Sequence, residues 1–139
     1  MAKEVITNAK VVIDSYDFAN NALDATINLG PDLIDVTGFS ASAWREFLAG
    51  LLSWSVTLGF HHDFADNAVN EKLFDWVVAR TAVTIEVTKA DTTVSATNPK
   101  WSGSVLFGQG VPVFGGSIGA VSGGSITLQG TGTLTRAVA

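Results

Sequence analysis

The stretch from Ser53 to Val78 constrains the fold most, because its hydrophobic period changes halfway along. Its first part, residues 53–60, carries a large apolar side chain at every second position, which is typical of a strand with one buried face. The residues of that face are Trp54, Val56, Leu58 and Phe60. After a short polar turn, residues 66–78 follow a helical period instead. The apolar stripe of this helix consists of Val69, Leu73, Trp76 and Val77.

The helix predicted over residues 66–78 has a recognisable N-terminus. Asp66 or Asn67 can accept hydrogen bonds from the free N–H groups of the first turn. Asp66 and Glu71 also place negative charge near the positive end of the helix dipole. Since the sequence contains no second convincing helix, we expect one helix to cover one sheet.

The other strand signals are alternating runs that end at turn residues. They cover residues 10–15, 24–29, 82–88, 101–107 and 125–135. Residues 111–114 suit only an edge strand, because Pro112 donates no ladder hydrogen bond. We interpret residues 10–15 and 24–29 as an antiparallel pair. The pattern predicts a mainly β, α+β fold: an antiparallel β-sandwich or small barrel of about seven strands with one flanking α-helix.

Residues 33–50 fit neither pattern well. A strand-like segment at 35–40 precedes residues 43–49, which resemble one or two helical turns. We interpret the whole stretch as an extended loop, and loops of about twenty residues are commonly functional. Its apolar bulk, from Trp44, Phe47, Leu51 and Leu52, exceeds that of a free loop.

Length and composition limit the organisation. A chain of 139 residues predicts a single domain over residues 1–139, with residues 1–10 as a polar N-terminal arm. The hydrophobic content of 47% with only 15% charged residues suggests that some apolar surface is reserved for a partner. The absence of cysteine excludes disulfides and thiol nucleophiles. No apolar run is long enough for a membrane helix and no signal peptide is evident, so we expect synthesis in the cytoplasm and no membrane partner.

Charge is distributed unevenly within the net −5. All 13 acidic residues precede Thr92, and five aspartates but no base lie between Lys10 and Arg45. A surface built from that stretch would repel nucleic acid rather than bind it.

Three residue clusters resemble functional sites, but for each one the simpler explanation is that its residues belong to a turn. His61, His62 and Asp63 are adjacent, so on extended chain they cannot all bind one metal ion without a tight bend. The glycines at 108–119 resemble a phosphate-binding loop but do not lie between a strand and a helix. Asp14 and Asp17 lack both a calcium-loop pattern and a basic partner nearby in sequence. We therefore expect no enzymatic activity, no cofactor and no metal site.

Several features follow one another in a familiar order. They are residues 13–17 at a first strand, the loop Asp35-Val36-Thr37-Gly38-Phe39, the strand at 50–55, the helix, residues 101–105 and a glycine- and threonine-rich C-terminal strand. In this order they resemble the bacteriophage tail tube (major tail) proteins of long, non-contractile tails, over nearly the whole chain. The resemblance implies a β-sandwich or barrel flanked by a helix. It also implies six copies per ring and rings stacked into a hollow tube through which DNA leaves the virion.

The resemblance suggests roles for two groups of residues. A tube for DNA should have a wall that repels phosphate, so acidic residues are candidates for lining the lumen. These lumen candidates are Asp14, Asp17, Asp24, Asp32, Asp35 and Glu86. Solubilising the outer surface is an equally open role for any one of them. The extended loop at 33–50 supplies candidates for contacts between subunits: Val36, Thr37, Gly38, Phe39, Trp44 and Phe47.

The partners implied are further copies of the chain, the tail tip, tape-measure and tail terminator proteins, and DNA in transit through the lumen. The implied location is the virion tail. The terminal segments 1–10 and 135–139 are further candidates for contacts between rings. Two alternatives stay open: a tube subunit of a secretion or injection system, and a monomeric β-sandwich binding module, for instance for carbohydrate on an exposed Trp44 or Trp101.

Overall fold

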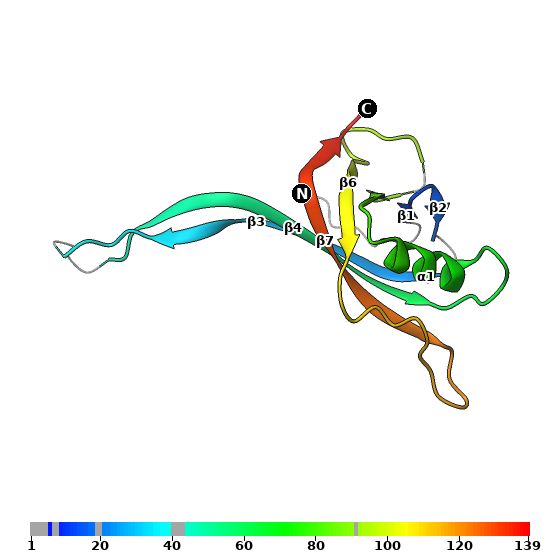
Figure 1. Ribbon diagram of the computed structural model, residues 1–139. Coiled ribbons are helices and arrows are strands. Elements are labelled where there is room, and N and C mark those ends of the chain that lie inside the picture. The colour runs from blue at the N-terminus through cyan, green and yellow to red at the C-terminus, as the bar shows by residue number, and fades with distance from the viewer. Residues whose placement is uncertain (1–5, 7–8, 19–20, 40–43, 91) are drawn as a thin grey trace.

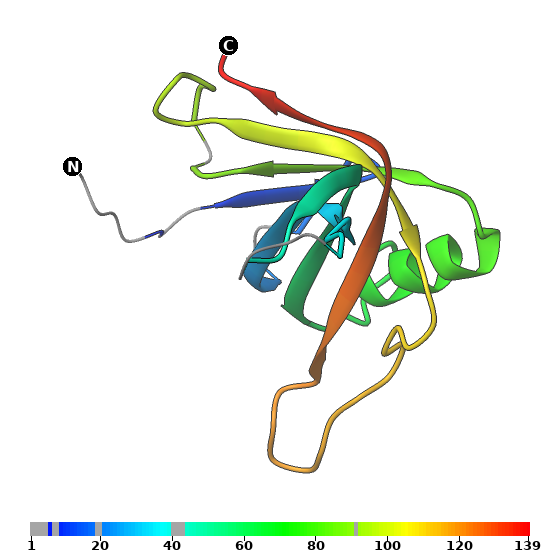
Figure 2. The ribbon, with the colours of Figure 1, turned by 90° about the vertical axis from the view of Figure 1, so that its left-hand side faces the viewer.

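The computed structural model describes residues 6, 9–18, 21–39, 44–90 and 92–139, which form one curled antiparallel sheet and one helix (Figures 1 and 2). The strands in chain order are β1 (Lys10–Ile13), β2 (Tyr16–Asp17), β3 (Ala22–Asp35), β4 (Phe47–His61), β5 (Val83–Thr88), β6 (Lys100–Phe107) and β7 (Gly123–Ala137). The helix α1 (Val69–Ala79) connects β4 to β5. The strand order in the sheet is β2-β1-β5-β6-β7-β4-β3. The predicted fold class is confirmed, with the strands in a single sheet rather than in two stacked ones.

The predicted pairing of the first two strands is wrong. The segment β1 pairs with β5, whereas β3 pairs with β4 at the far edge of the sheet. The cause is local: Asp14 and Ser15 both have positive φ, at 48° and 66°, and turn the chain back at once into β2. A two-residue turn of this kind closes a tight hairpin. The chain then leaves this hairpin and crosses to the other edge.

The core lies where the sequence predicts it, on the sheet face that carries α1. The four predicted residues of β4 (Trp54, Val56, Leu58 and Phe60) are all buried. They pack with Ile126 and Leu128 of β7 and with Val69, Leu73 and Trp76 of α1. Val77, the fourth residue of the predicted helical stripe, is only partly buried.

The helix begins later than predicted, and neither Asp66 nor Asn67 caps it. Ala68 occupies the cap position and makes no side-chain cap hydrogen bond. Asn67 instead has a left-handed backbone with φ of 59°, and its N–H donates to Oε2 of Glu71 at 2.6 Å. Glu71 therefore reaches back to the N-terminus and satisfies a backbone donor there.

The Trp54 side chain leaves no room for a Cβ at two glycines, Gly103 of β6 and Gly130 of β7. A Cβ built on Gly130 would overlap the Trp54 indole, and one built on Gly103 would lie 2.6 Å from it. The indole N–H donates to the carbonyl of Gly132 at 3.0 Å. Gly132, with φ of 81°, lies in a bulge of β7, where the register with β6 shifts between Ser102 and Ser104.

The edge strand predicted at residues 111–114 is wrong. These residues lie in the connection between β6 and β7, residues 108–122, which contains no strand. We call this connection the β6–β7 loop. It lies at the opposite end of β7 from the C-terminus (Figures 1 and 2).

Candidate functional site

The strands β3 and β4 extend beyond the rest of the sheet as a two-stranded arm (Figure 1). We define the arm as residues 30–39 and 44–53. Because β7 pairs with β4 only over Ser55–His61, the outer part of β4 has β3 as its sole partner among the described strands. The stretch from Phe47 to Ser53 spans roughly 20 Å at the usual rise of a strand.

The loop predicted for residues 33–50 is therefore wrong in its secondary structure. Leu33–Asp35 belong to β3, and Phe47–Gly50 belong to β4. A register shift between Pro31 and Leu33 interrupts the alternation of the pair and hides the strand period in the sequence. The helical turns suggested for residues 43–49 are absent from their described part, 44–49, which runs into β4.

Both faces of the arm are apolar and exposed. Directly paired residues of an antiparallel ladder point to the same face. Leu33 lies opposite Ala49, and Ile34 opposite Leu48, so neighbouring pairs place apolar side chains on opposite faces. The exposed large apolar residues of the arm are Leu33, Ile34, Val36, Phe39, Trp44, Phe47, Leu48, Leu51 and Leu52. A free surface of this kind marks an interaction site.

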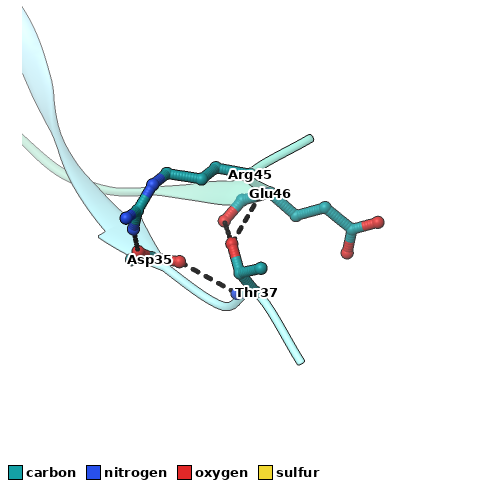
Figure 3. A network of polar contacts seen from close by, with 4 residues as sticks. All are labelled: Asp35, Thr37, Arg45 and Glu46. Atoms are coloured by element: carbon teal, nitrogen blue, oxygen red, sulfur yellow. Dashed lines mark hydrogen bonds and ion pairs between the residues drawn. The ribbon is translucent and has the colours of Figure 1, made fainter. Parts of the chain in front are cut away.

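A network of polar contacts holds the end of the arm together (Figure 3). Asp35 accepts a hydrogen bond from the backbone N–H of Thr37 and forms an ion pair with Arg45, both at 2.9 Å. The backbone N–H of Glu46 donates to the Thr37 hydroxyl oxygen at 2.8 Å. Hydrogen bonding from the side chain and backbone of Thr37, followed by Arg45, lowers the pKa of Asp35 below its ordinary value. We call this network the clasp.

All six predicted contact residues lie on this arm. Val36 and Thr37 continue β3, and the N–H of Val36 donates to the carbonyl of Glu46 at 2.9 Å. Phe39 and Trp44 lie beyond the clasp and are exposed, Trp44 to 81%. Sequence reasoning singled out the apolar bulk of Leu51 and Leu52 but missed Leu33, Ile34 and Leu48. The available signal was that adjacent apolar residues in a strand must point to both faces.

The sheet face opposite α1 is polar. On β7 the buried Ile126 and Leu128 point toward α1, so Thr127 and Gln129 point away. Residues paired with them continue this face across the sheet. Its hydroxyl and amide side chains include Thr26, Asn28, Ser55, Thr57, Thr84, Ser104, Thr127 and Gln129.

Of the six lumen candidates, four lie on this polar face. Asp24 packs over Gly59 and accepts its N–H at 3.1 Å. Glu86 forms an ion pair with Lys100 at 3.6 Å. Val12 lies opposite Glu86 on one side and opposite Asp17 on the other, so Asp17 and Glu86 lie on the same face. Asp32 lies on the continuation of this face along the arm, beside Gly50.

The other two lumen candidates lie elsewhere. The Asp14 carboxylate accepts a hydrogen bond from Nε1 of Trp76 at 3.1 Å, which places it on the helix side of the sheet. Asp35 is part of the clasp. The structure therefore does not bring the six carboxylates together in one cluster.

An open hollow of about 1100 Å³ lies on the face that carries α1. The helix has 11 residues, so it spans roughly 16 Å and covers only one end of the sheet. The hollow lies on the part of this face that α1 does not cover, at the end of β7 that is far from the β6–β7 loop, and the described residues Ile6 and Ala9 ahead of β1 also line it. Its apolar lining includes Val11, Leu23, Ala25, Ile27, Leu29, Val87, Trp101 and Leu134. Lys89 and Arg136 are also among its lining residues.

The described residues contain no group of three or more His, Asp or Glu side chains arranged to hold a metal ion. The His62 ring packs between Phe60 and Phe64, with centroid distances of 5.1 and 5.4 Å. The glycines at 108–119 belong to the β6–β7 loop and precede a strand rather than a helix. Within the described part of the chain, no helix has the length and apolar character needed to cross a membrane.

No protein-family model matches the sequence, and a search of curated proteins found no match. Solved structures, in contrast, contain chains of similar fold. A chain of the virion of a native gene transfer agent particle aligns with a TM-score of 0.72 and 16% identity, over 94% of this chain and 95% of that chain. A chain in the tail of an empty gene transfer agent particle, refined with C6 symmetry, aligns with a TM-score of 0.69 and 17% identity, over 91% and 95%. At these identities the likeness is one of fold, and at that level the resemblance to tail tube proteins is confirmed.

Proposed function

We propose that the protein is a structural subunit of a phage-like tail. In this proposal its copies form hexameric rings, and the rings stack into a tube through which DNA leaves the particle. The observation that carries the proposal is the fold shared, over nearly the full length of both chains, with a chain of a C6-symmetric tail. The sixfold ring is taken from that symmetry.

The arm supports self-association. Nine large apolar side chains of the arm are exposed, on both of its faces. If each side chain exposes about 100 Å² of surface, the nine together expose about 900 Å². This area is comparable to the roughly 800 Å² that each partner buries in a stable interface. Because the arm is apolar on both faces, its apolar surface is removed from water only when neighbouring copies cover both faces.

The polar sheet face supports a role as the lumen wall. Hydroxyl and amide side chains with few bases hold DNA weakly, because affinity for DNA depends on lysine and arginine contacts to phosphate. Asp17, Asp24, Asp32 and Glu86 lie on this face and add repulsion. We place this face toward the lumen and α1 toward the outside of the tube.

The proposal assigns no catalytic step to the chain. Its location would be the virion tail. Its partners would be further copies of itself, the tail tip, tape-measure and terminator proteins, and DNA only in transit. The single domain over residues 1–139 would then carry both the tube wall and the joints between subunits.

Negative-stain electron microscopy of the purified chain, across a concentration series followed by light scattering, tests the proposal. Hollow rings or tubes of uniform diameter are the expected result. A chain that stays monomeric at every concentration, and also after addition of pre-formed tail tips, would contradict it.

A further inference from the structure

We propose that the β6–β7 loop is a pH-sensitive strap. It lies against the body while the imidazole of His62 is neutral, and it lifts when that imidazole takes up a proton. The inference concerns the single subunit, so it stands or falls independently of the proposed function. It rests on the contacts that fasten the loop, on the surroundings of the His62 ring and on the lack of charge in the loop.

The first half of the β6–β7 loop is fastened to α1 and to the turn that precedes α1. Nδ2 of Asn70 donates a hydrogen bond to the carbonyl of Val113 at 2.6 Å. The Phe114 ring lies beside the Phe64 ring, with a centroid distance of 6.3 Å. Phe114 is still 78% exposed. Because this contact buries little apolar area, its release costs little free energy.

The second half of the loop is fastened to the end of β4. The backbone N–H of His62 donates to the carbonyl of Ser122 at 2.9 Å. The hydroxyl of Ser122 donates in turn to the carbonyl of Gly115, which holds two sides of the loop together. Gly110 and Gly119 have φ of 87° and 88°, which glycine adopts without strain, so the loop can hinge at these positions.

The His62 ring lies between these fastening points, in apolar surroundings. It meets the Phe60 ring edge-on and stacks on the Phe64 ring. Both ring nitrogens of His62 are buried, and neither has a hydrogen-bond partner among the described residues. Buried polar groups nearly always have such a partner, so an exception calls for an explanation.

A proton on this ring is costly while the loop is docked. A neutral imidazole has one N–H donor and one acceptor nitrogen, whereas the imidazolium has two N–H donors and a positive charge. Burying an unpaired donor costs free energy, and burying an unpaired charge costs more. Lifting the loop lets water reach the ring nitrogens, so protonation favours the lifted state.

The neighbouring elements offer the proton no direct partner. The β6–β7 loop carries no charged residue, and the one titratable residue of β4, His61, points to the opposite face of the sheet. In the turn before α1, the Asp63 carboxylate accepts the N–H of Ala65 at 3.0 Å, and Asp66 is exposed. Glu71 of α1 accepts a backbone N–H of the same turn. These carboxylates attract the proton, but none of them forms a hydrogen bond to the ring.

Lifting the loop changes the surface at this end of the sheet. Pro112 packs over Gly124, where a Cβ would lie 2.6 Å from Cγ of Pro112, and Val111 packs against the core. Acid therefore uncovers apolar surface around Phe60 that the docked loop covers. Because lifting takes up one proton, its equilibrium constant can rise by at most about tenfold per pH unit.

Hydrogen exchange of the His62 amide tests the inference, because its acceptor Ser122 belongs to the loop. We would measure its protection, relative to the intrinsic exchange rate, by NMR of the dilute full chain at about pH 7.5 and pH 5, between which an imidazole changes its charge. The control amide is that of Phe18, which donates to the carbonyl of Val11 at 2.9 Å. The expected result is a several-fold fall in protection at His62 in acid and no fall at Phe18. Equal protection of the His62 amide at both pH values would overturn the inference.

Two variants assign the effect to the His62 ring. His62→Phe keeps an aromatic ring that cannot take up a proton, so the amide at this position should be equally protected at both pH values. The matched control is His61→Gln, which removes the neighbouring histidine and should keep the wild-type fall. A fall that persists in His62→Phe, or that disappears in His61→Gln, would overturn the inference.

A second readout needs no substitution. In the wild-type chain, the chemical shift of the His62 Cε1–H group should change with pH at the same midpoint as the protection of the His62 amide. Different midpoints for the two signals would also overturn the inference.

Discussion

At the scale of single residues, the contact of Trp54 with Gly130 and Gly103 fixes how closely β6 and β7 approach β4. A Gly130→Ala substitution would push a methyl group into the indole, and overpacking of this kind costs about 1–3 kcal/mol. For a domain of this size we expect the melting temperature to fall by roughly 3–10 °C. Thermal unfolding followed by circular dichroism measures the effect.

Gly108→Ala is the matched control, since a Cβ at this position meets nothing within 4 Å. Its melting temperature should stay close to that of the wild type. Equal losses in both variants would mean that the Trp54 contact is not the source of the effect.

The clasp is sensitive to pH through Asp35. Hydrogen bonding from Thr37 and the pairing with Arg45 lower the pKa of Asp35. The stability that its ionised carboxylate gives to the clasp is therefore fully present above the unfolded pKa of about 3.9 and is lost as pH falls through the lower folded pKa. We expect the Thr37 amide to exchange faster with solvent on going from pH 5 to pH 3, relative to its intrinsic rate. Hydrogen exchange followed by NMR measures this. The Asp35→Asn variant should exchange fast at both pH values, and protection that is unchanged in that variant would contradict the role of Asp35.

At the scale of elements, the sequence predicts what the chain buries within itself. The strand at 53–60 and the helical stripe from Val69 to Trp76 are confirmed because burial of one face imposes a period on the sequence. The arm has no such period, since both of its faces are apolar and a bulge interrupts its register. The hollow could not be predicted either, because its lining comes from β1, β3, β5, β6 and β7, and their order in the sheet is set by long-range pairing.

Removing the arm should separate folding from assembly. We would delete residues 33–50 and join Asp32 to Leu51 through Asn-Gly, a sequence that favours a tight hairpin turn. The core lies outside the arm, so the variant should fold with a nearly unchanged near-UV circular dichroism spectrum and remain monomeric. Size-exclusion chromatography with light scattering measures its mass.

A control for the arm deletion is Val78→Gln, which changes an apolar residue of α1 that is as exposed as Leu48 of the arm. This variant should assemble like the wild type if α1 faces outward in the tube. Tubes formed by the deletion variant would show that the arm is not needed for association.

At the scale of the whole molecule, the two sheet faces differ in a way that suits the proposed tube. The face with α1 holds the core and leaves a hollow, whereas the opposite face is hydroxyl-rich and carries no large apolar cluster among the described residues. Placing the polar face inward gives DNA a wall with few cations. The helix and the arm are then available for contacts on the outside and between copies.

This placement predicts where added positive charge would capture DNA. Lysines at Thr127, Thr131 and Thr135 of β7 would stand on the polar face, and each assembled tube would gain many phosphate contacts in its lumen. We expect short duplex DNA to co-sediment with these tubes at low salt, to be released by salt with a steep dependence, and to resist nuclease because the wall encloses it. The control carries the same added charge on the outside, as Phe74→Lys, Val78→Lys and Ala79→Lys on α1, all exposed positions. DNA bound to the control should be digested, and digestion of the DNA held by the β7 variant would place the polar face on the outer surface instead.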